Sequence, residues 1–251
     1  MLKVLRERIH QGHRTLRYPD PDVVLPAPFR GVPKIEPSLC GANCDECVSS
    51  CPTNAISLAP LRIDLGHCVF CGVCEEKCPA DAIKFTQDHR VSVRTREDLI
   101  VSAEGLKLAA ALDEKSKSIF VHSLKLRQVS AGGCNGCEGE LVATGNVVFD
   151  LGRFGVQFVA SPRHADGILI TGPVTENMEN ALRQTYAAVP APKIVIAFGA
   201  CAIGGGPFHG ASASRNGVPS DISVDLFVAG CPPHPLSVLD GILRLLDRIG
   251  G

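Results

Sequence analysis

The spacing of its cysteines limits what this 251-residue chain can fold into more than any other feature. Eight of the twelve cysteines lie within residues 40–78, and the others are Cys134, Cys137, Cys201 and Cys231. Cysteines grouped in this way form either metal sites or disulfides. The sequence shows no apolar stretch of membrane-spanning length and no secretory h-region near its first residue. We therefore expect a cytosolic protein whose reduced thiols bind metal.

The cysteines of the first half form two runs of similar spacing. These runs are Cys40-x3-Cys44-x2-Cys47-x3-Cys51-Pro52 and Cys68-x2-Cys71-x2-Cys74-x3-Cys78-Pro79. In two-cluster bacterial ferredoxins, three thiolates of such a run hold one 4Fe-4S cluster and the fourth crosses to the other. The rule predicts one cluster held by Cys40, Cys44, Cys47 and Cys78, and a second held by Cys51, Cys68, Cys71 and Cys74.

The first run departs from the ferredoxin pattern at one point. Three residues separate Cys40 from Cys44, where the usual run has two, so the loop around Cys44 is expected to adjust. Four thiolates also suit zinc, which leaves a pair of zinc sites as an alternative. The doubled run with its Cys-Pro crossover favours iron–sulfur clusters.

Beyond residue 118 the sequence alternates between apolar, β-rich runs and helical patterns. We expect strands at 123–130, 156–161, 166–172, 193–199 and 224–230, and helices near 137–148, 175–187 and 235–249. This alternation predicts a doubly wound, flavodoxin-like α/β domain with a mostly parallel sheet.

The four remaining cysteines follow the carboxyl ends of these strands, where ligands bind in open α/β sheets. Cys134 and Cys137 share one loop, while Cys201 and Cys231 lie on two others. Such loops can converge, and helix N-termini there aim amides at an anionic cluster, so we expect one 4Fe-4S cluster on these four residues. The alternative to this cluster is a thioredoxin-like redox pair formed by Cys134 and Cys137. Such a pair would leave Cys201 and Cys231 without a role.

Glu138 directly follows Cys137 at the expected start of a helix. An acidic residue there suits the helix dipole, which is the simpler reason for its presence. A role in proton relay is the other explanation. Apart from this residue, no catalytic side chain is expected in the chain.

The N-terminal third holds three further segments. Residues 1–17 are expected to form a short amphipathic helix with Leu2, Leu5 and Ile9 on one side and mostly basic residues elsewhere. Such a helix docks on a membrane subunit or on anionic headgroups, or it lies on its own protein. Five prolines within residues 18–36 predict an extended strap.

The linker at residues 93–118 and the net charge of the chain complete the expected organisation. A helix with Thr95 as its N-cap is expected across residues 93–118. The net charge of −1 gives no indication of a nucleic-acid partner. We expect a helix with a strap, a two-cluster ferredoxin-like α+β domain, a connector and an α/β domain, at residues 1–36, 37–92, 93–125 and 126–251.

Four segments carry a resemblance to a known family: GGCNGCE, DGILITGPVTENMENALRQTY, PKIVIAFGACAIGGGPF and VDLFVAGCPPHP. Through them, residues 127–245 resemble the cluster-bearing small subunit shared by complex I (its 20 kDa subunit) and membrane-bound nickel–iron hydrogenases. Residues 11–85 resemble the two-cluster ferredoxin subunit of the same machines, through the cysteine runs, Tyr18-Pro19 and Phe29-Arg30-Gly31. The chain looks like a fusion of two adjacent subunits.

One motif bears on which machine the chain resembles. Complex I subunits have two adjacent cysteines where this chain has Cys134-Asn135-Gly136-Cys137, a form that resembles nickel–iron hydrogenases of the energy-converting and formate hydrogenlyase type. The resemblance implies an electron relay through three 4Fe-4S clusters, beside a large, complex I 49 kDa-like subunit that holds the nickel–iron site. It also implies membrane subunits, an external low-potential donor or acceptor, and a peripheral place on the cytoplasmic face of the inner membrane. The alternatives are the equivalent subunit of a quinone-reducing or nickel-free complex, and a free-standing ferredoxin-like carrier.

Overall fold

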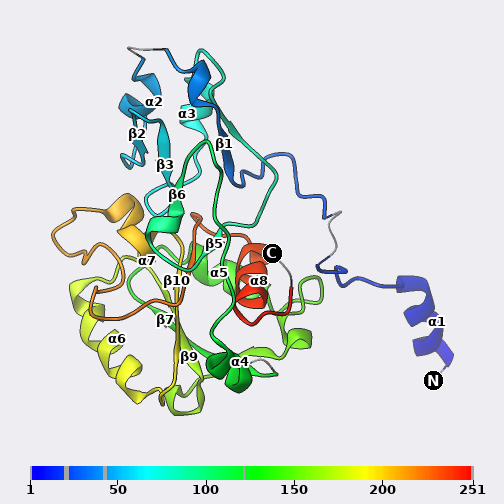
Figure 1. Cartoon of the computed structure of the whole chain (residues 1–251). Helices are drawn as coiled ribbons and strands as arrows, with labels where there is room; N and C mark the ends of the chain where they lie inside the picture. Colours follow the sequence, from blue (N-terminus) through cyan, green and yellow to red (C-terminus); the bar gives the residue numbers. More distant parts are fainter. Residues whose placement is uncertain (1, 20–22, 42–43, 121, 250–251) are drawn as a thin grey trace.

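The computed structural model describes residues 2–19, 23–41, 44–120 and 122–249. Residues 42 and 43, where the first cysteine run has its additional residue, lie outside the described residues. A smaller part with both cysteine runs stands on a larger α/β part, and the N-terminal helix lies apart from both (Figure 1).

A six-stranded sheet forms the centre of the larger part, in the order β5-β11-β10-β9-β7-β8. Its strands are β5 (Ser92–Val93), β7 (Leu124–Ser130), β8 (Val156–Phe158), β9 (Gly167–Thr171), β10 (Ile194–Phe198) and β11 (Leu226–Val228). All neighbours are parallel except β5, which pairs antiparallel with β11. Without β5, the order counted along the chain is 2-1-3-4-5, the flavodoxin-like arrangement. The predicted doubly wound sheet is therefore present.

Helices cover both faces of this sheet because its central strands are apolar on both faces. Every residue of β9 and β10 is buried. On one face, Ile196 and Phe198 pack in a cluster that includes α5 (Gly136–Ala143) and α8 (Pro235–Leu245). On the other face, Val195 packs in a cluster with Leu182 of α6 (Glu176–Ala188). Continuous apolar runs of this kind are typical of parallel strands.

Short elements build the smaller part. They comprise the pair β1 (Pro33–Ile35) and β4 (Ile83–Phe85), the sheet of β2 (Ile56–Ser57), β3 (Arg62–Asp64) and β6 (Ile100–Val101), and the helices α2 (Glu46–Ser49) and α3 (Val73–Glu76). Its apolar cluster continues into the larger part through Ala197, Ala202 and Ala229. The two parts therefore share a packed contact.

The prediction of one helix across residues 93–118 is wrong except for its last five residues, which belong to α4 (Glu114–Phe120). The Thr95 hydroxyl accepts a hydrogen bond from the Asp98 amide (3.3 Å), but only a single 3-10 turn, η2 (Glu97–Leu99), forms there. The chain then extends into β6, where Val101 is fully buried and pairs with Ile63 of β3. Burial and strand pairing outweigh the helical propensity of this segment.

The remaining helices are short, with ten residues or fewer. The α-helices are α1 (Leu2–Gln11), α4 (Glu114–Phe120) and α7 (Ala200–Gly204). The 3-10 helices are η1 (Pro37–Leu39), η2 (Glu97–Leu99), η3 (Leu151–Phe154), η4 (Pro162–His164) and η5 (Gly206–Phe208). None of the helices among the described residues has the length and apolar character needed to cross a bilayer.

Candidate metal centres

The first set of thiols gathers around α2, in the smaller part. Cys47 is buried, while Cys40, Cys44 and Cys78 are half-buried. Burial raises the pKa of the Cys47 thiol, and the nearby thiols of Cys40, Cys78 and Cys44 raise it further. Cys78, from the second run, is thus a close neighbour of the cysteines of the first run.

The second set gathers around α3. Burial raises the pKa of Cys68 and of Cys74 to about 12, and the thiols of Cys51 and Cys71 contribute to both rises. All four residues line one cavity with apolar side chains around it. The Phe70 amide also donates a hydrogen bond to Cys68 Sγ (3.3 Å). Cys51, from the first run, therefore lies with the three cysteines of the second.

The two crossover cysteines have equivalent surroundings. The Ala55 amide donates a hydrogen bond to Cys51 Sγ (3.3 Å), and the Ala82 amide donates one to Cys78 Sγ (3.2 Å). In both repeats the residue before this alanine has left-handed backbone, with φ of 52° and 53°. These turns aim an amide at each crossover sulfur, which favours its thiolate form.

The third set lies at the carboxyl ends of β7, β10 and β11. Cys201 is buried, Cys137 is half-buried, and Cys134 and Cys231 are exposed. Burial raises the pKa of Cys137, and the thiols of Cys201, Cys231 and Cys134 add to the rise. Gly199 makes room for this set, since a Cβ on it would lie 2.6 Å from Cys137 Sγ. Three separate loops thus bring four sulfur atoms together.

Glu138 is held firmly beside the third set, in the first turn of α5. Its Oε1 accepts hydrogen bonds from Ser130 Oγ (2.7 Å) and Thr171 Oγ1 (2.5 Å). Burial raises its pKa, but these two hydrogen bonds outweigh that effect and lower it. Its Oε2 is buried and has no hydrogen-bond partner among the described residues. The carboxylate thus has one oxygen fixed by two strands and the other free for a further donor.

The chemistry of these three sets fits iron–sulfur clusters. A buried thiol with a raised pKa ionises only if a nearby positive charge offsets the cost of desolvation. The iron ions of a cluster supply that charge, and metal binding releases the protons. Within the described part of the chain, no three His, Cys, Asp or Glu side chains converge closely enough to hold a single metal ion.

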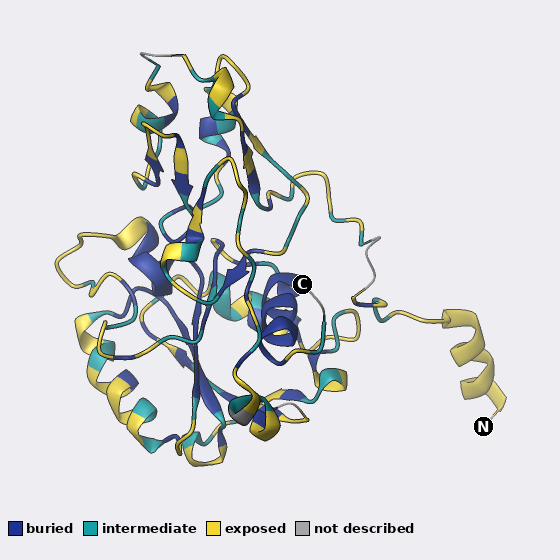
Figure 2. Cartoon of the chain, in the orientation of Figure 1, coloured by how far each residue is buried: buried dark blue, intermediate teal, exposed yellow. Residues whose placement is uncertain are grey.

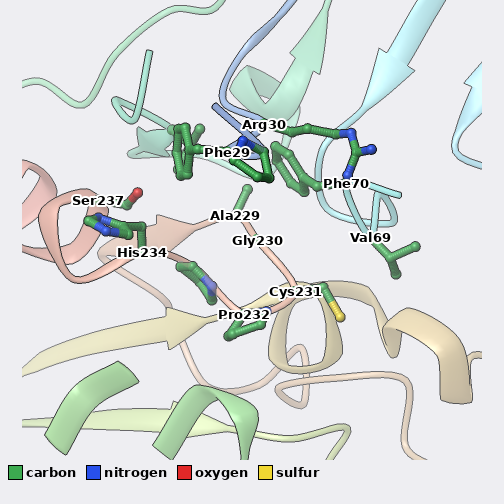
Figure 3. Close-up of a pocket in the computed structure, with 13 residues that line it drawn as sticks. Phe29, Arg30, Val69, Phe70, Ala229, Gly230, Cys231, Pro232, His234 and Ser237 are labelled. Atoms are coloured by element: carbon green, nitrogen blue, oxygen red, sulfur yellow. The ribbon is translucent and has the colours of Figure 1, made fainter. Parts of the chain in front are cut away.

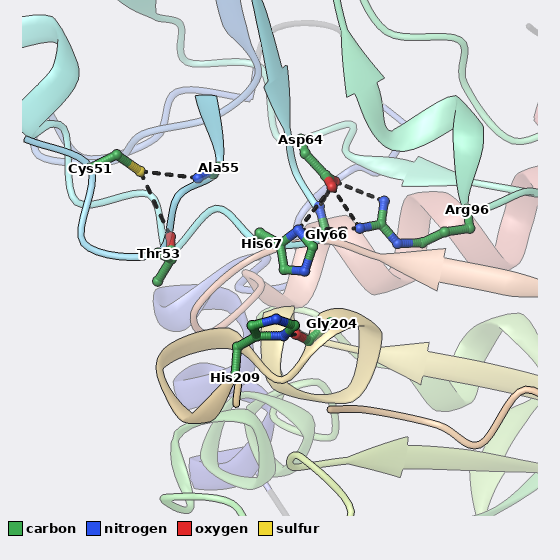
Figure 4. Close-up of polar contacts among 9 residues, drawn as sticks. All are labelled: Cys51, Thr53, Ala55, Asp64, Gly66, His67, Arg96, Gly204 and His209. Carbon is green, nitrogen blue, oxygen red and sulfur yellow. Dashed lines mark hydrogen bonds and ion pairs between the residues drawn. The ribbon is translucent and has the colours of Figure 1, made fainter. Parts of the chain in front are cut away.

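A half-buried ion pair orders the loop before Cys68 (Figure 4). Arg96 donates two hydrogen bonds to the Asp64 carboxylate, at 2.7 and 2.6 Å. The Gly66 amide and His67 Nδ1 donate to the same carboxylate, at 2.8 and 2.9 Å. Burial opposes the charge on Asp64, but Arg96 holds its pKa below the usual range. This group was not predicted, because no sequence motif links Asp64 to Arg96.

The same loop contacts the helix that carries Cys201. The rings of His67 and His209 meet edge to face, with centroids 5.1 Å apart (Figure 4). His209 Nδ1 donates a hydrogen bond to the carbonyl of Gly204, the last residue of α7 (2.8 Å). His67 thus links the loop of the second set to the helix of the third.

A cavity of about 200 Å³, open to one side, lies at a second contact between the two parts, beside Cys231 (Figure 3). Phe29 of the strap and Phe70 of the smaller part lie on one side, and the loop from Gly230 to His234 lies on the other. His234 caps α8, because its Nδ1 accepts a hydrogen bond from the Leu236 amide (3.2 Å). Burial lowers the pKa of His234 to about 4. This histidine is thus a half-buried cap near the third set.

Comparison with known proteins follows the same division of the chain. The family model of the NADH ubiquinone oxidoreductase 20 kDa subunit matches residues 134–245, and that of a 4Fe-4S binding domain matches residues 61–84. The chain is 44% identical over 121 residues to the probable membrane-bound hydrogenase subunit mbhJ of Pyrococcus furiosus. That alignment covers 48% of this chain and 72% of the relative. The chain belongs to the 20 kDa subunit family.

Two further relatives are named as subunits of different enzymes. Formate hydrogenlyase subunit 7 of Escherichia coli is 39% identical over 154 residues, or 59% of this chain and 60% of the relative. An NADH-quinone oxidoreductase subunit of Geotalea daltonii is 47% identical over 114 residues, or 45% of this chain and 66% of the relative. The chain spans roughly two thirds of the length of these two relatives. The family expected from the sequence is confirmed, as is a 4Fe-4S binding domain in its first half.

Proposed function

We propose that this chain is the electron-transfer subunit of a membrane-associated nickel–iron hydrogenase of the formate hydrogenlyase or energy-converting type. The chain would hold three 4Fe-4S clusters, one on each set of four cysteines. A bound 4Fe-4S cluster takes up and returns one electron at a time. The nickel–iron site would lie on a large partner subunit.

The exposed edge of the third set is the observation that carries this proposal. Cys134 and Cys231 lie at the surface, whereas Cys137 and Cys201 lie deeper. An electron relay needs such an edge, because the next redox group must approach closely. A partner that covers these two cysteines would receive electrons there and shield the cluster from water.

Two residues separate Cys134 from Cys137, and this spacing supports a hydrogenase over a complex I assembly. Asn135 has left-handed backbone (φ 69°), and α5 begins at the following residue, Gly136. This turn presents the first sulfur outward and the second inward. Two relatives with hydrogenase or formate hydrogenlyase in their names agree with this choice.

The chain's own residues would bind and tune the clusters. The thiolates neutralise the iron charge, and the amides of Ala55, Phe70 and Ala82 donate to three of them. Hydrogen bonds to ligand sulfur are expected to raise the reduction potential, since they stabilise the added negative charge. Glu138 would lower the reduction potential of the third cluster, because its negative charge opposes the added electron. Its Oε2 atom would also be placed to relay a proton.

A second candidate keeps the relay and changes its terminus. The identity of 47% to an NADH-quinone oxidoreductase subunit favours a complex I-like assembly that reduces quinone. In either case the partners would include membrane subunits and a low-potential donor or acceptor. We propose a peripheral place on the cytoplasmic face of the membrane.

The test is to purify a tagged copy anaerobically with whatever assembles around it. Nickel in the complex, together with dihydrogen evolution driven by reduced viologen, is the expected result. An intact complex with iron but neither nickel nor dihydrogen evolution would favour the quinone-reducing assembly. A chain that purifies alone with its clusters intact would favour a free-standing carrier.

A further inference from the structure

The N-terminal helix makes no packing contact that buries any of its residues. Leu2, Leu5 and Ile9 of α1 are 86%, 61% and 75% exposed, and no residue of the helix is buried. Figure 2 shows α1 exposed along its whole length and separate from the body. The structure thus argues against the expectation that this helix lies on its own protein. Within the described part of the chain, no residue covers these three large apolar side chains.

The helix is nevertheless well formed, and only a short segment joins it to the body. Arg8 Nη1 donates a hydrogen bond to the Gly12 carbonyl (3.0 Å), which satisfies an acceptor at the helix end. Leu16 is the first firm anchor on the body: its amide donates to the Val148 carbonyl (2.9 Å), and Arg153 donates to its carbonyl (2.6 Å). The residues between Gly12 and Leu16 leave α1 free to meet a surface outside the chain.

The charges of this segment identify the surface that it suits. At 3.6 residues per turn, Leu2, Leu5 and Ile9 form one stripe, with Arg6 and Arg8 on its two sides. Residues 2–17 contain five Lys or Arg and one acidic residue, although the whole chain has a net charge of −1. An apolar stripe bordered by long basic side chains matches the boundary between lipid tails and anionic headgroups, because those side chains can reach the headgroups while their stems stay apolar.

We propose that α1 lies in the surface of a bilayer containing anionic phospholipid, with Leu2, Leu5 and Ile9 toward the lipid tails. A groove on a partner protein is the competing occupant, but the basic residues on both sides of the stripe favour anionic headgroups. This contact is direct, and it adds to any attachment through membrane subunits. It does not rest on the electron-transfer function, so each can fail without the other.

The test measures cosedimentation of the full, cluster-loaded chain with vesicles. One preparation is pure phosphatidylcholine and the other contains about one third phosphatidylglycerol. We expect binding only to the anionic vesicles, with a loss of about tenfold in affinity when Leu5→Ser and Ile9→Ser are combined, or Lys3→Gln and Arg6→Gln. Matched control variants are Ile119→Ser and Arg62→Gln, which change exposed residues outside α1 and should bind normally.

A fluorescent reporter keeps the proposal testable if sedimentation is weak. The chain has no tryptophan, so Leu5→Trp places a single indole in the apolar stripe and Gln11→Trp places one on the opposite side of α1. A blue shift of Leu5→Trp alone on adding anionic vesicles supports the proposal. The same emission with and without vesicles for both variants overturns it. If partner subunits shift the emission of the Leu5→Trp indole to the blue in the absence of lipid, the proposal is overturned in favour of a groove on a protein.

Discussion

His67 and Gly204 are packed so closely that a Cβ on Gly204 would lie 2.8 Å from the histidine ring. His67 adjoins Cys68 of the second set, and Gly204 ends the helix that carries Cys201 of the third. This contact fixes how the two sites lie relative to each other. At the other contact between the two parts a cavity lies beside Cys231, so the His67–Gly204 contact is the better packed of the two.

Gly204→Ala is expected to loosen this contact. The methyl group must displace the His67 ring and the Gly66 carbonyl, and such overpacking costs about 1–3 kcal/mol. We expect a lower unfolding temperature and a weaker spin–spin interaction between the reduced clusters. Gly139→Ala is the matched control, since that glycine is also helical and has nothing within 4 Å of the added carbon. Equal behaviour of the two variants would contradict the prediction.

Cys78→Ser tests the exchange of ligands between the two runs. Because Cys78 lies with Cys47 in the structure, the substitution should damage the cluster of the first run and spare that of the second. Cys51→Ser is its mirror control and should do the reverse. Cluster-resolved electron paramagnetic resonance distinguishes them. Loss of the second-run cluster in the Cys78 variant would refute the crossover.

Cys231→Ser separates a four-cysteine cluster from a redox pair. If Cys231 is a ligand, the variant should lose the third cluster, about four iron ions per chain, while the ferredoxin-type clusters keep their spectra. A thioredoxin-like pair at Cys134 and Cys137 needs no third cysteine, so it predicts unchanged iron. Iron and zinc analysis of the purified protein decides between these outcomes and also tests the zinc alternative.

The cysteine groups and the parallel sheet were predictable because their signals are local. Ligand spacing lies within a few residues of sequence, and the buried runs at β9 and β10 are continuous. The strands β5 and β6 were not predictable, because each has two residues and exists only through its pairing partner. Their segment has helical propensity, and tertiary pairing overrides it.

The contact between His67 and Gly204 was also beyond sequence reasoning. The two residues are far apart in the chain, and neither belongs to a motif. The glycine-rich stretch after Cys201 is packed just as closely, since a Cβ on Gly206 would lie 3.1 Å from Cys201 Sγ. Glycines in a sequence can indicate such crowding, but they do not identify the residue that fills the space.

Tyr18→Phe should weaken the attachment of the strap to α8. The Tyr18 hydroxyl donates a buried hydrogen bond to Asp240 Oδ1 (2.7 Å), and Arg244 donates to Oδ2 (2.8 Å). Removing one donor from a buried carboxylate costs about 1–3 kcal/mol. Thermal unfolding measures the loss. Tyr186→Phe is the control, because that ring lies over Lys193 and the substitution keeps the ring.

Asp225→Asn is expected to stabilise the protein, and the gain should depend on pH. Burial raises the pKa of Asp225, although the Val195 amide donates a hydrogen bond to its Oδ2 (2.9 Å). The unfolded chain therefore ionises this group at a lower pH than the folded chain, so the native aspartate destabilises the fold once pH rises above its usual pKa. An asparagine keeps an acceptor for Val195 without that charge.

The gain from Asp225→Asn should thus be present at neutral pH and shrink as pH falls toward the usual aspartate range. Differential scanning calorimetry of both proteins, from mildly alkaline pH down to the lowest pH at which the clusters persist, measures the difference in unfolding temperature. Asp221→Asn provides a contrast, since Arg183 lowers the pKa of that exposed carboxyl. Its substitution should not stabilise at neutral pH. A gain for Asp225→Asn that grows on acidification would mean that the buried carboxylate stabilises the fold, against the expected sign.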